Sequence, residues 1–200
     1  NKISHYFSKN VKLKLFKNRD FVDIRKKRYV NFHNFSKIFE AYHFINKDFN
    51  DVNFRKFLIK NVKKYDHVIV CDFGHGLINS KLADFITKKA KFVSANIQTN
   101  SGNRGYNLFT KYKKLDFLCI DEPELRLGLS DKNTETNDLI NSLNQAKYKN
   151  IMLTQGNRGL SFKQGNKKIL WLPPVATNLK DTIGAGDAAF SFASCFIKNS

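Results

Sequence analysis

The chain lacks most of the features that mark exported and membrane proteins. It has three cysteines, three prolines and one tryptophan, and no run of about 18 apolar residues that could cross a membrane. Its N-terminus, Asn1-Lys2-Ile3-Ser4-His5, has no initiator methionine and no apolar signal core. We therefore expect a cytoplasmic protein, and a piece cut from a longer chain.

The cysteines also exclude a zinc site. Cys71, Cys119 and Cys195 lie far apart, and no two of them have the spacing of metal ligands. The five histidines form no cluster either. Each cysteine lies in an apolar stretch, which is typical of reduced core residues in a cytoplasmic protein.

Acidic residues are scarce relative to basic ones. The chain has 35 Lys and Arg against 17 Asp and Glu, a net charge of +18. Such a charge is found in proteins that bind nucleic acid, anionic membranes or phosphorylated metabolites. The lysines are scattered along the chain rather than gathered on one helix face, which favours a merely compositional origin. A basic nucleic-acid-binding protein remains the alternative, and a steep salt dependence of binding would favour it.

The pattern of apolar residues predicts an α/β fold. With 42% hydrophobic residues in 200, the chain can bury the core of one domain. Residues 11–32 alternate and predict two extended segments around a turn, whereas helical spacing predicts a helix over 34–44. Further on we expect helices near 54–64, 80–89 and 136–147, strands at 67–71, 91–96, 115–120 and 150–154, a hairpin over 160–172, and a helix after Gly184. This alternation predicts an open, mostly parallel sheet.

Polar or glycine-bearing segments follow the predicted strands. In open α/β sheets, ligands bind beyond the carboxyl ends of the strands. The segments that fall there are residues 72–76, 96–105, 121–124 and 154–159. The sequence therefore places the functional site at this edge of the sheet.

The segment Asp181-Thr182-Ile183-Gly184-Ala185-Gly186-Asp187 carries the strongest chemical signal. A loop of small residues that opens a helix presents unpaired backbone amides, and the helix dipole adds to their attraction for an anion. Asp187 lies in the first helical turn, beside that anion. A carboxylate there makes chemical sense if it takes a proton from a hydroxyl that attacks phosphorus. The simpler alternative is a glycine N-cap with Asp187 as a helix-dipole carboxylate.

The whole seven-residue string resembles the second signature of the PfkB, or ribokinase-like, carbohydrate kinases. Three further segments resemble family motifs in the right order. Asp121-Glu122-Pro123-Glu124 is similar to Asn-x-x-Glu, with Asp121 in place of Asn, and Thr154–Gly159 is similar to Thr-x-Gly-x-x-Gly. Asp72-Phe73-Gly74-His75-Gly76 resembles Asp-Tyr-Gly-Lys-Gly of the heptose-phosphate kinase branch, including kinases fused to nucleotidyltransferases. Asn96-Ile97-Gln98 departs from the Asp-Pro-Lys of that branch.

This resemblance, over roughly residues 11–198, implies a three-layer α/β/α kinase with a mostly parallel central sheet. Residues 54–200 would form the core and 11–32 a small β lid. The implied reaction transfers the γ-phosphoryl group of ATP, with Mg²⁺, to a sugar or sugar phosphate, in a context such as nucleotide-activated sugar synthesis. A homodimer and a fused nucleotidyltransferase are further implied partners, and no membrane is involved. The family's N-terminal Gly-Gly motif and the region beyond the catalytic helix are missing, so a catalytically incomplete nucleotide-binding remnant is a second alternative.

The resemblance also assigns roles to single residues. Asp187 is the expected base, and the amides of Gly184, Ala185 and Gly186 are the expected anion hole. The other expected contacts are Thr154, Gly156, Gly159, Asp181 and Thr182 with the nucleotide, Asp121 and Glu124 with water-bound Mg²⁺, and Asp72 and Gly74 with the substrate.

Simpler readings stay open for several of these polar residues. Asp72 could instead cap the following helix. His75, Arg104 and Arg158 could be solvated loop residues, although both arginines could also contact phosphate. Trp171 is expected in the core.

Overall fold

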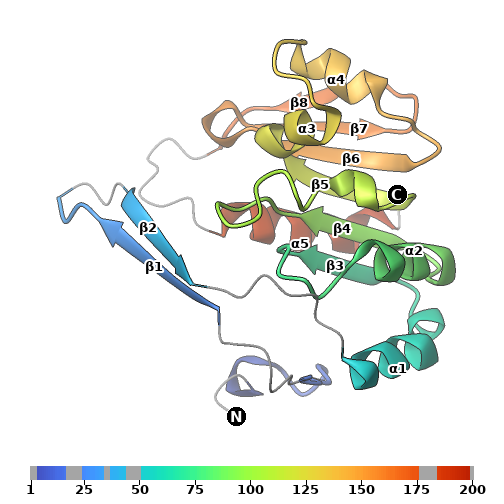
Figure 1. Ribbon diagram of the computed structural model, residues 1–200. Coiled ribbons are helices and arrows are strands. Elements are labelled where there is room, and N and C mark those ends of the chain that lie inside the picture. The colour runs from blue at the N-terminus through green and yellow to red at the C-terminus, as the bar shows by residue number, and fades with distance from the viewer. Residues whose placement is uncertain (1–3, 17–23, 34–36, 44–50, 176–183, 199–200) are drawn as a thin grey trace.

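The computed structural model describes residues 4–16, 24–33, 37–43, 51–175 and 184–198 (Figure 1). Its helices are α1 (Val52–Asn61), α2 (Ser80–Lys89), α3 (Glu122–Leu129), α4 (Thr136–Ser142) and α5 (Ala185–Ile197), with short 3-10 turns η1 (Ser4–Tyr6), η2 (Val62–Lys64), η3 (Phe109–Lys111) and η4 (Gly156–Arg158). Its strands are β1 (Arg25–Val30), β2 (Lys37–His43), β3 (Val68–Asp72), β4 (Val93–Ile97), β5 (Leu115–Asp121), β6 (Tyr148–Thr154), β7 (Leu160–Gln164) and β8 (Leu170–Leu172).

Six strands form one central sheet in the order β3-β4-β5-β6-β7-β8. The first four are parallel, and β7 and β8 join them antiparallel as a hairpin. The prediction of a mostly parallel α/β sheet is confirmed, as are the hairpin over 160–172 and the helix after Gly184. Since the parallel strands end at one edge, the loops that follow them meet there.

The sheet is covered on both faces, which gives three layers (Figure 1). One face packs against α2, η3, α3 and α4 through a large cluster that includes Ile86, Phe109, Leu118, Leu125 and Ile140. The other face packs against α5, where Phe190 meets Phe117, Cys119 and Met152. Alternate residues of β5 therefore point into the two cores, as expected for a strand buried on both sides.

The N-terminal region differs from the sequence-based prediction. The strands of its antiparallel hairpin are β1 and β2, at 25–30 and 37–43, whereas Val11, Leu13 and Leu15 lie in irregular chain. The predicted helix over 34–44 is wrong, because residues 37–43 form β2. Contacts across the hairpin explain the difference: Tyr29 stacks on Phe39 with ring centroids 4.1 Å apart. Such cross-strand pairing outweighs a helical spacing within one strand.

Two helices also differ from the prediction. α4 ends at Ser142 rather than near residue 147, and α3 directly follows β5, where only a polar strand end was expected. The signal for α3 was present in the sequence, because Asp121 and Glu124 form a capping box at its start.

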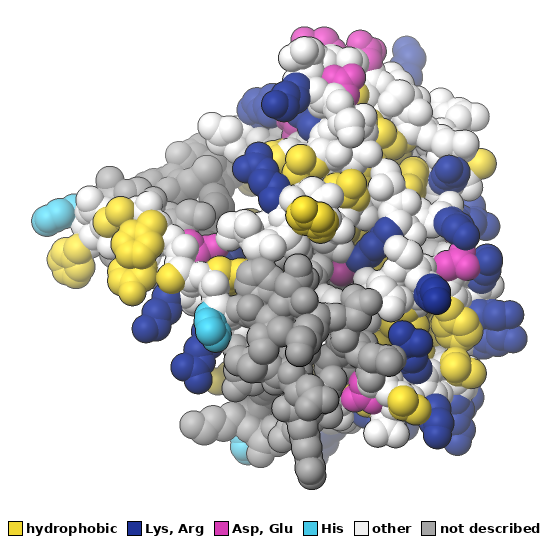
Figure 2. All heavy atoms as spheres, in the orientation of Figure 1, with side chains coloured by type: hydrophobic (Ala, Val, Ile, Leu, Met, Phe, Trp, Pro, Cys, Tyr) yellow, Lys and Arg dark blue, Asp and Glu magenta, His cyan; other side chains and the backbone are white. Residues whose placement is uncertain are grey.

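The basic side chains form no single stripe on the face that Figure 2 presents. Lys and Arg lie spread over this face among hydrophobic and uncharged side chains. Within the described ranges, no helix is long and apolar enough to cross a membrane.

Candidate active site

The loops after β3 and β4 and the start of α5 come together at the carboxyl edge of the sheet. The clearest link is a hydrogen bond of 2.6 Å from Gln98 Nε2, just after β4, to Asp187 Oδ1 in the first turn of α5. Burial raises the pKa of the Cys119 thiol in β5 to about 12; a hydrogen bond with Asn96 opposes this, and the charges of Glu124, Asp187 and Asp121 add smaller raising effects. The hydrogen bonds from Gln98 to Asp187 and from Thr99 to Glu124 bring both carboxylates to the loop after β4.

The start of α5 has the form of an anion site. Gly184 is the N-cap, with a left-handed φ of 81° and no side-chain cap, so the first amides of the helix lack the usual capping acceptor. A Cβ added to Gly186 would meet no atom of the described residues within 4 Å. Glycine weakens a helix by roughly 1 kcal/mol relative to alanine. No contact within the described residues requires glycine at position 186, and the space over its backbone is open to a ligand.

A pocket of about 380 Å³ lies between this helix start and the β1-β2 hairpin. The hairpin contributes Lys26, Arg28 and Tyr42, the sheet loops contribute Phe73, His75 and Gln98, and α5 contributes Gly184, Gly186 and Asp187. Glu40 pairs with Lys26 at 3.3 Å and with Arg28 at 2.9 Å. The hairpin wall therefore carries two cations held by one carboxylate.

Within the described residues, a hydrogen bond between Tyr42 and His75 links the hairpin to the loop after β3. The Tyr42 hydroxyl lies 2.6 Å from His75 Nε2, and their rings lie 5.6 Å apart. In the tautomer with an unprotonated Nε2, the hydroxyl donates to the ring nitrogen. His75 is thus a contact between hairpin and sheet rather than a solvated loop residue.

Asp72 is the buried centre of the loop after β3. It is 4% exposed, and its Oδ2 accepts a hydrogen bond of 2.7 Å from the Tyr112 hydroxyl and pairs with Lys111 Nζ at 2.5 Å. Its Oδ1 accepts from the Gly74 amide at 3.1 Å. The cap of α2 is Asn79, not Asp72, so the capping alternative for Asp72 is wrong.

Asparagine side chains fasten this loop to the next one. Asn103 donates to the carbonyls of Phe73 and Gly74, and Asn107 donates to the carbonyls of Asp72 and Gln98. A Cβ on Gly74 would lie 1.9 Å from Asn103 Nδ2. Glycine is therefore required at 74 by this close packing as well as by its φ of 69°.

Asp121 and Glu124 form a coupled pair at the start of α3. Glu124 accepts backbone hydrogen bonds from Asp121 at 2.8 Å and from Thr99 at 2.7 Å, while Asp121 Oδ1 accepts from the Glu124 amide. Burial, and then the neighbouring Asp121 charge, raise the pKa of Glu124. Among the described residues no group of three His, Cys, Asp or Glu forms a metal cage. Two carboxylates fit a Mg²⁺ ion that keeps most of its waters.

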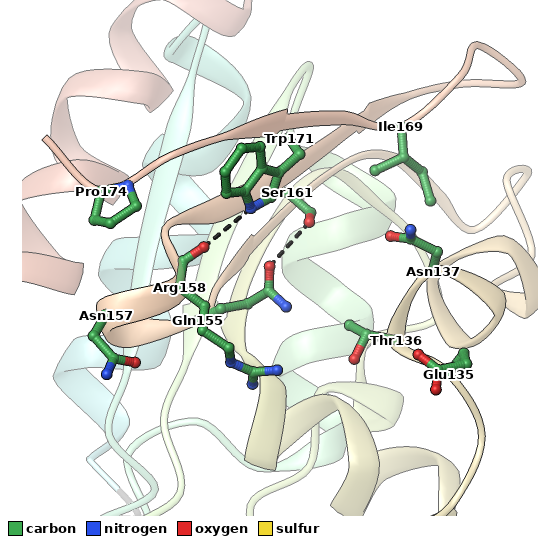
Figure 3. Close-up of a pocket in the computed structure, with 10 residues that line it drawn as sticks. All are labelled: Glu135, Thr136, Asn137, Gln155, Asn157, Arg158, Ser161, Ile169, Trp171 and Pro174. Atoms are coloured by element: carbon green, nitrogen blue, oxygen red, sulfur yellow. Dashed lines mark hydrogen bonds between the residues drawn. The ribbon is translucent and has the colours of Figure 1, made fainter.

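The segment Thr154–Gly159 turns from β6 into β7. Gly156 and Gly159 have positive φ values of 59° and 88°, and a Cβ on Gly159 would lie 2.1 Å from the Leu172 carbonyl oxygen. This loop borders a separate pocket of about 490 Å³ toward α4 (Figure 3). There the Trp171 indole, which is 61% exposed rather than in the core, donates to the Arg158 carbonyl at 3.0 Å.

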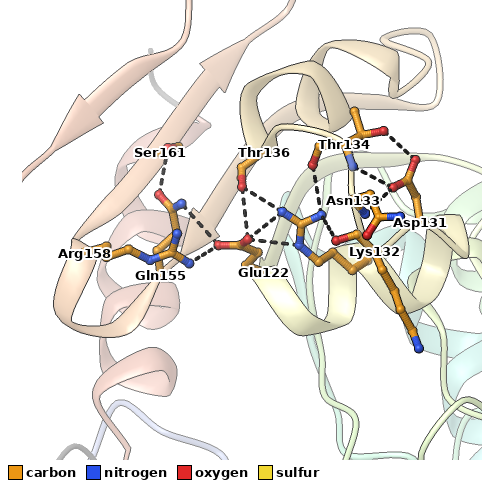
Figure 4. Close-up of polar contacts among 10 residues, drawn as sticks. Glu122, Asp131, Lys132, Asn133, Thr134, Thr136, Gln155, Arg158 and Ser161 are labelled. Carbon is orange, nitrogen blue, oxygen red and sulfur yellow. Dashed lines mark hydrogen bonds and ion pairs between the residues drawn. The ribbon is translucent and has the colours of Figure 1, made fainter.

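Glu122 binds α3, α4 and the β6-β7 loop together (Figure 4). Its carboxylate accepts from Arg126 at 2.8 Å and Thr136 at 3.0 Å, and it also pairs with Arg158. Burial raises the pKa of Glu122, but the hydrogen bonds from Arg126, Thr136 and Gln155 outweigh it and lower the value. Arg158 is thus paired with the Glu122 carboxylate. Arg104 lines a pocket together with Glu122 and Arg158.

Comparison with known proteins identifies the family. A model described as pfkB family carbohydrate kinase matches residues 44–199. The chain belongs to the pfkB family. It is 30% identical over 143 residues to the bifunctional protein HldE of Aliarcobacter butzleri, covering 68% of this chain and 29% of that protein.

The fold is that of solved ribokinase-like kinases. Phosphofructokinase-2 from Escherichia coli matches with a TM-score of 0.56 at 12% identity, over 80% of this chain and 54% of that one. A ribokinase from Arabidopsis thaliana, solved with ribose and ATP, matches with a TM-score of 0.58 at 14% identity, over 80% and 53%. The chain spans about half the length of these structures and less than a third of the HldE relative.

The pfkB motifs converge only in part. Asp187, Gly184 and Gly186 line the pocket beside the hairpin, and Ala185 lies between these glycines. Glu124 and Asp121 lie at the adjacent strand end, whereas the loop that carries Gly156 borders the other pocket. Asp181 and Thr182 lie outside the described residues. The assigned roles of these residues, and of Thr154, Gly159, Asp72 and Gly74, remain predictions.

Sequence reasoning missed four residues that line this candidate site: Lys26, Arg28, Tyr42 and Gln98. The first three were missed because the hairpin was placed too early in the chain. Gln98 stood out only as a departure from a family pattern, and no local signal linked it to Asp187, which lies 89 residues further on.

Acid should loosen the hairpin of this pfkB chain. Burial, and then Lys26, lower the pKa of His75, against a smaller raising effect of Asp72. A pKa lowered by folding gives stability that is present above the unfolded value of about 6.5 and lost as pH falls through the folded value. Limited proteolysis, normalised to an unfolded substrate, should therefore cut the hairpin faster at acid pH than at neutral pH. Tyr42→Phe should be cut fast at both pH values. Equal rates for the unmodified protein at both would contradict this role of His75.

Proposed function

We propose that this chain transfers the γ-phosphoryl group of ATP to a hydroxyl of a sugar or sugar phosphate. One observation carries the proposal: Asp187 stands in a pocket beside an open, glycine-lined helix start. A general base and an anion site thus adjoin the same space.

Asp187 has the central chemical role. As the acceptor oxygen bonds to the γ-phosphorus, the bridging P–O bond to the β-phosphate breaks and ADP leaves. The hydroxyl proton passes to the Asp187 carboxylate. The amides of Gly184, Ala185 and Gly186 stabilise the charge of the transferring group without reorganising.

Mg²⁺ supplies neutralisation of phosphate charge when it is bound. Glu124 and Asp121 would hold its waters rather than the ion. Thr154, Gly156, Gly159, Asp181 and Thr182 complete the proposed nucleotide contacts, and Asp72 with Gly74 shapes the loop beside the acceptor.

The charges of the hairpin favour a sugar acceptor that already carries a phosphate group. Lys26 and Arg28 give the pocket wall two positive charges, of which Glu40 neutralises one. Arginine in particular binds phosphate in a fixed fork geometry. We also propose that the reaction serves the synthesis of nucleotide-activated sugars, on the basis of the similarity to the bifunctional HldE relative. A cytoplasmic location, a homodimer and a fused nucleotidyltransferase are further parts of this proposal.

A panel of acceptors tests this function. The protein expressed from the full reading frame should release ADP from Mg·ATP only when a sugar acceptor is present. Ribose, fructose 6-phosphate and a heptose phosphate are the first to compare, and the phosphorylated acceptors should give the higher kcat/KM. ADP release at the same rate with every acceptor and with none would contradict phosphoryl transfer to a sugar.

A further inference from the structure

We propose that Gln98 is a positioning residue that holds the Asp187 carboxylate toward the acceptor hydroxyl. The inference rests on the proposed function, because it assigns Asp187 as the base. It concerns a residue that no sequence motif marks as part of the reaction.

Two side chains, Asn96 and Gln98, link the sheet to Asp187 through hydrogen bonds. Asn96, which is 5% exposed, donates from Nδ2 to the Cys119 carbonyl in β5 at 3.1 Å. The same side chain accepts at Oδ1 a hydrogen bond of 2.9 Å from Gln98 Nε2. Gln98 Nε2 also donates to Asp187 Oδ1 at 2.6 Å.

These hydrogen bonds determine which way the Gln98 amide points. Both partners of Nε2 are oxygens, and the amide NH₂ has two hydrogens to donate. A flipped amide would set its own oxygen against both of them. The orientation of Asn96 is determined in turn by the backbone carbonyl that it contacts. The donor that faces Asp187 is therefore imposed by the core of the sheet.

The backbone around Gln98 is held as firmly as its side chain. Its amide donates to the Asp72 carbonyl at 2.9 Å, and its carbonyl accepts from Asn107 Nδ2 at 3.0 Å. The amide of Thr99, the next residue, donates to Glu124 Oε1 at 2.7 Å. The backbone of Gln98 is thus anchored to the end of β3 and, through Thr99, to the start of α3.

The consequence for catalysis is geometric. Gln98 and Asp187 line the same pocket, and Gln98 occupies Oδ1. Oδ2 is then the oxygen that accepts the proton, in an orientation that costs no further ordering when the acceptor binds. Positioned groups of this kind lower the barrier because the order is built in before the reaction.

Four substitutions at position 98 test the proposal in the full reading frame. Gln98→Met keeps the length but has no donor, and kcat should fall by about 10- to 100-fold, the size of one hydrogen bond to a charged group. KM for ATP should change by less than about threefold, since the lost contact acts in the transition state. Gln98→Lys keeps a donor and should recover most of the loss. Gln98→Glu brings a second carboxylate to Asp187 and should be at least as slow as Gln98→Met. In Gln98→Asn the side chain is too short for its amide to reach Asp187 Oδ1.

A double mutant shows whether Gln98 acts through Asp187. In an Asp187→Asn background, Gln98→Met should lower the residual kcat by less than about twofold, because residues that act as a unit are not additive. Gln145→Met is the matched control, since the half-buried Gln145 donates to the Leu143 carbonyl away from the pocket. Its kcat should equal that of the unmodified protein.

The outcomes separate the two proposals. If Asp187→Asn is inactive but Gln98→Met keeps full kcat, the positioning role fails and the proposed function stands. If Gln98→Met and Gln98→Lys lose kcat equally, donation by Gln98 is not what matters and the inference fails. If Asp187→Asn keeps its activity, the base assignment itself is wrong.

Discussion

Asp187→Asn should lower turnover by about 10²–10⁴-fold while leaving ATP affinity unchanged or slightly higher. That loss corresponds to about 3–5 kcal/mol of barrier, at roughly 1.36 kcal/mol per decade of rate. Asn keeps the shape of Asp and an Oδ1 that still accepts from Gln98, so the local geometry is preserved. It cannot take the hydroxyl proton, and it removes a negative charge beside the phosphates. Steady-state turnover and nucleotide affinity, measured on the same folded preparation, give both values.

A helix-capping role for Asp187 predicts a different result. Exchanging one carboxylate in a first helical turn for its amide costs at most about 1 kcal/mol of stability. The folded fraction would then keep its activity. Turnover within about threefold of the unmodified protein would remove Asp187 as the base, because a general base contributes far more than that.

Asp72→Asn should cost about 3–5 kcal/mol of folding stability, the usual result of breaking a buried ion pair and leaving one charge behind. The Lys111 ammonium loses its carboxylate partner, and the Tyr112 hydroxyl loses its acceptor. In a chain of this size, each kcal/mol lowers the melting temperature by about 2–4 °C. Thermal unfolding followed by circular dichroism measures the shift.

Asp66→Asn is the matched control for that experiment. Asp66 and Lys91 also form an ion pair, at 2.7 Å, but both side chains are more than half exposed. Exposed pairs contribute little, so no measurable shift is expected. If Asp72→Asn and Asp66→Asn shift the melting temperature equally, Asp72 is not the centre that holds the two loops together.

The sheet could be predicted from the sequence because its central strands, β4 and β5, are buried on both faces and therefore rich in apolar residues. Residues 68–71 and 117–120 are apolar runs, each followed by an aspartate, and the helices between strands carry their own periodicity. The hairpin could not be placed in the same way. Ile38 and Phe39 are 65% and 54% exposed, so no buried face imposes an alternating pattern on β2. Its register pairs Arg28 with Glu40 and Tyr29 with Phe39 across the two strands, which local spacing does not reveal.

The residues of the candidate site were likewise predictable only where the signal lies within one short segment of the sequence. Residues within the Gly184–Asp187 string were found because one short segment holds both the proposed anion site and the proposed base. Gln98 and the hairpin cations were not found, because their roles depend on contacts across many residues of chain. The roles of the asparagines in the loop after β4 could not be predicted either, because the role of an amide side chain depends on the backbone groups that it contacts in the folded protein.

The most direct test of phosphoryl transfer is ³¹P NMR of the full reading frame with Mg·ATP and a sugar phosphate. The γ-phosphorus signal should disappear as one new phosphate ester forms for each ADP released, and Asp187→Asn should leave the spectrum unchanged over the same time. Release of inorganic phosphate alone, with no ester from any acceptor, would contradict the assignment of this chain as a sugar kinase.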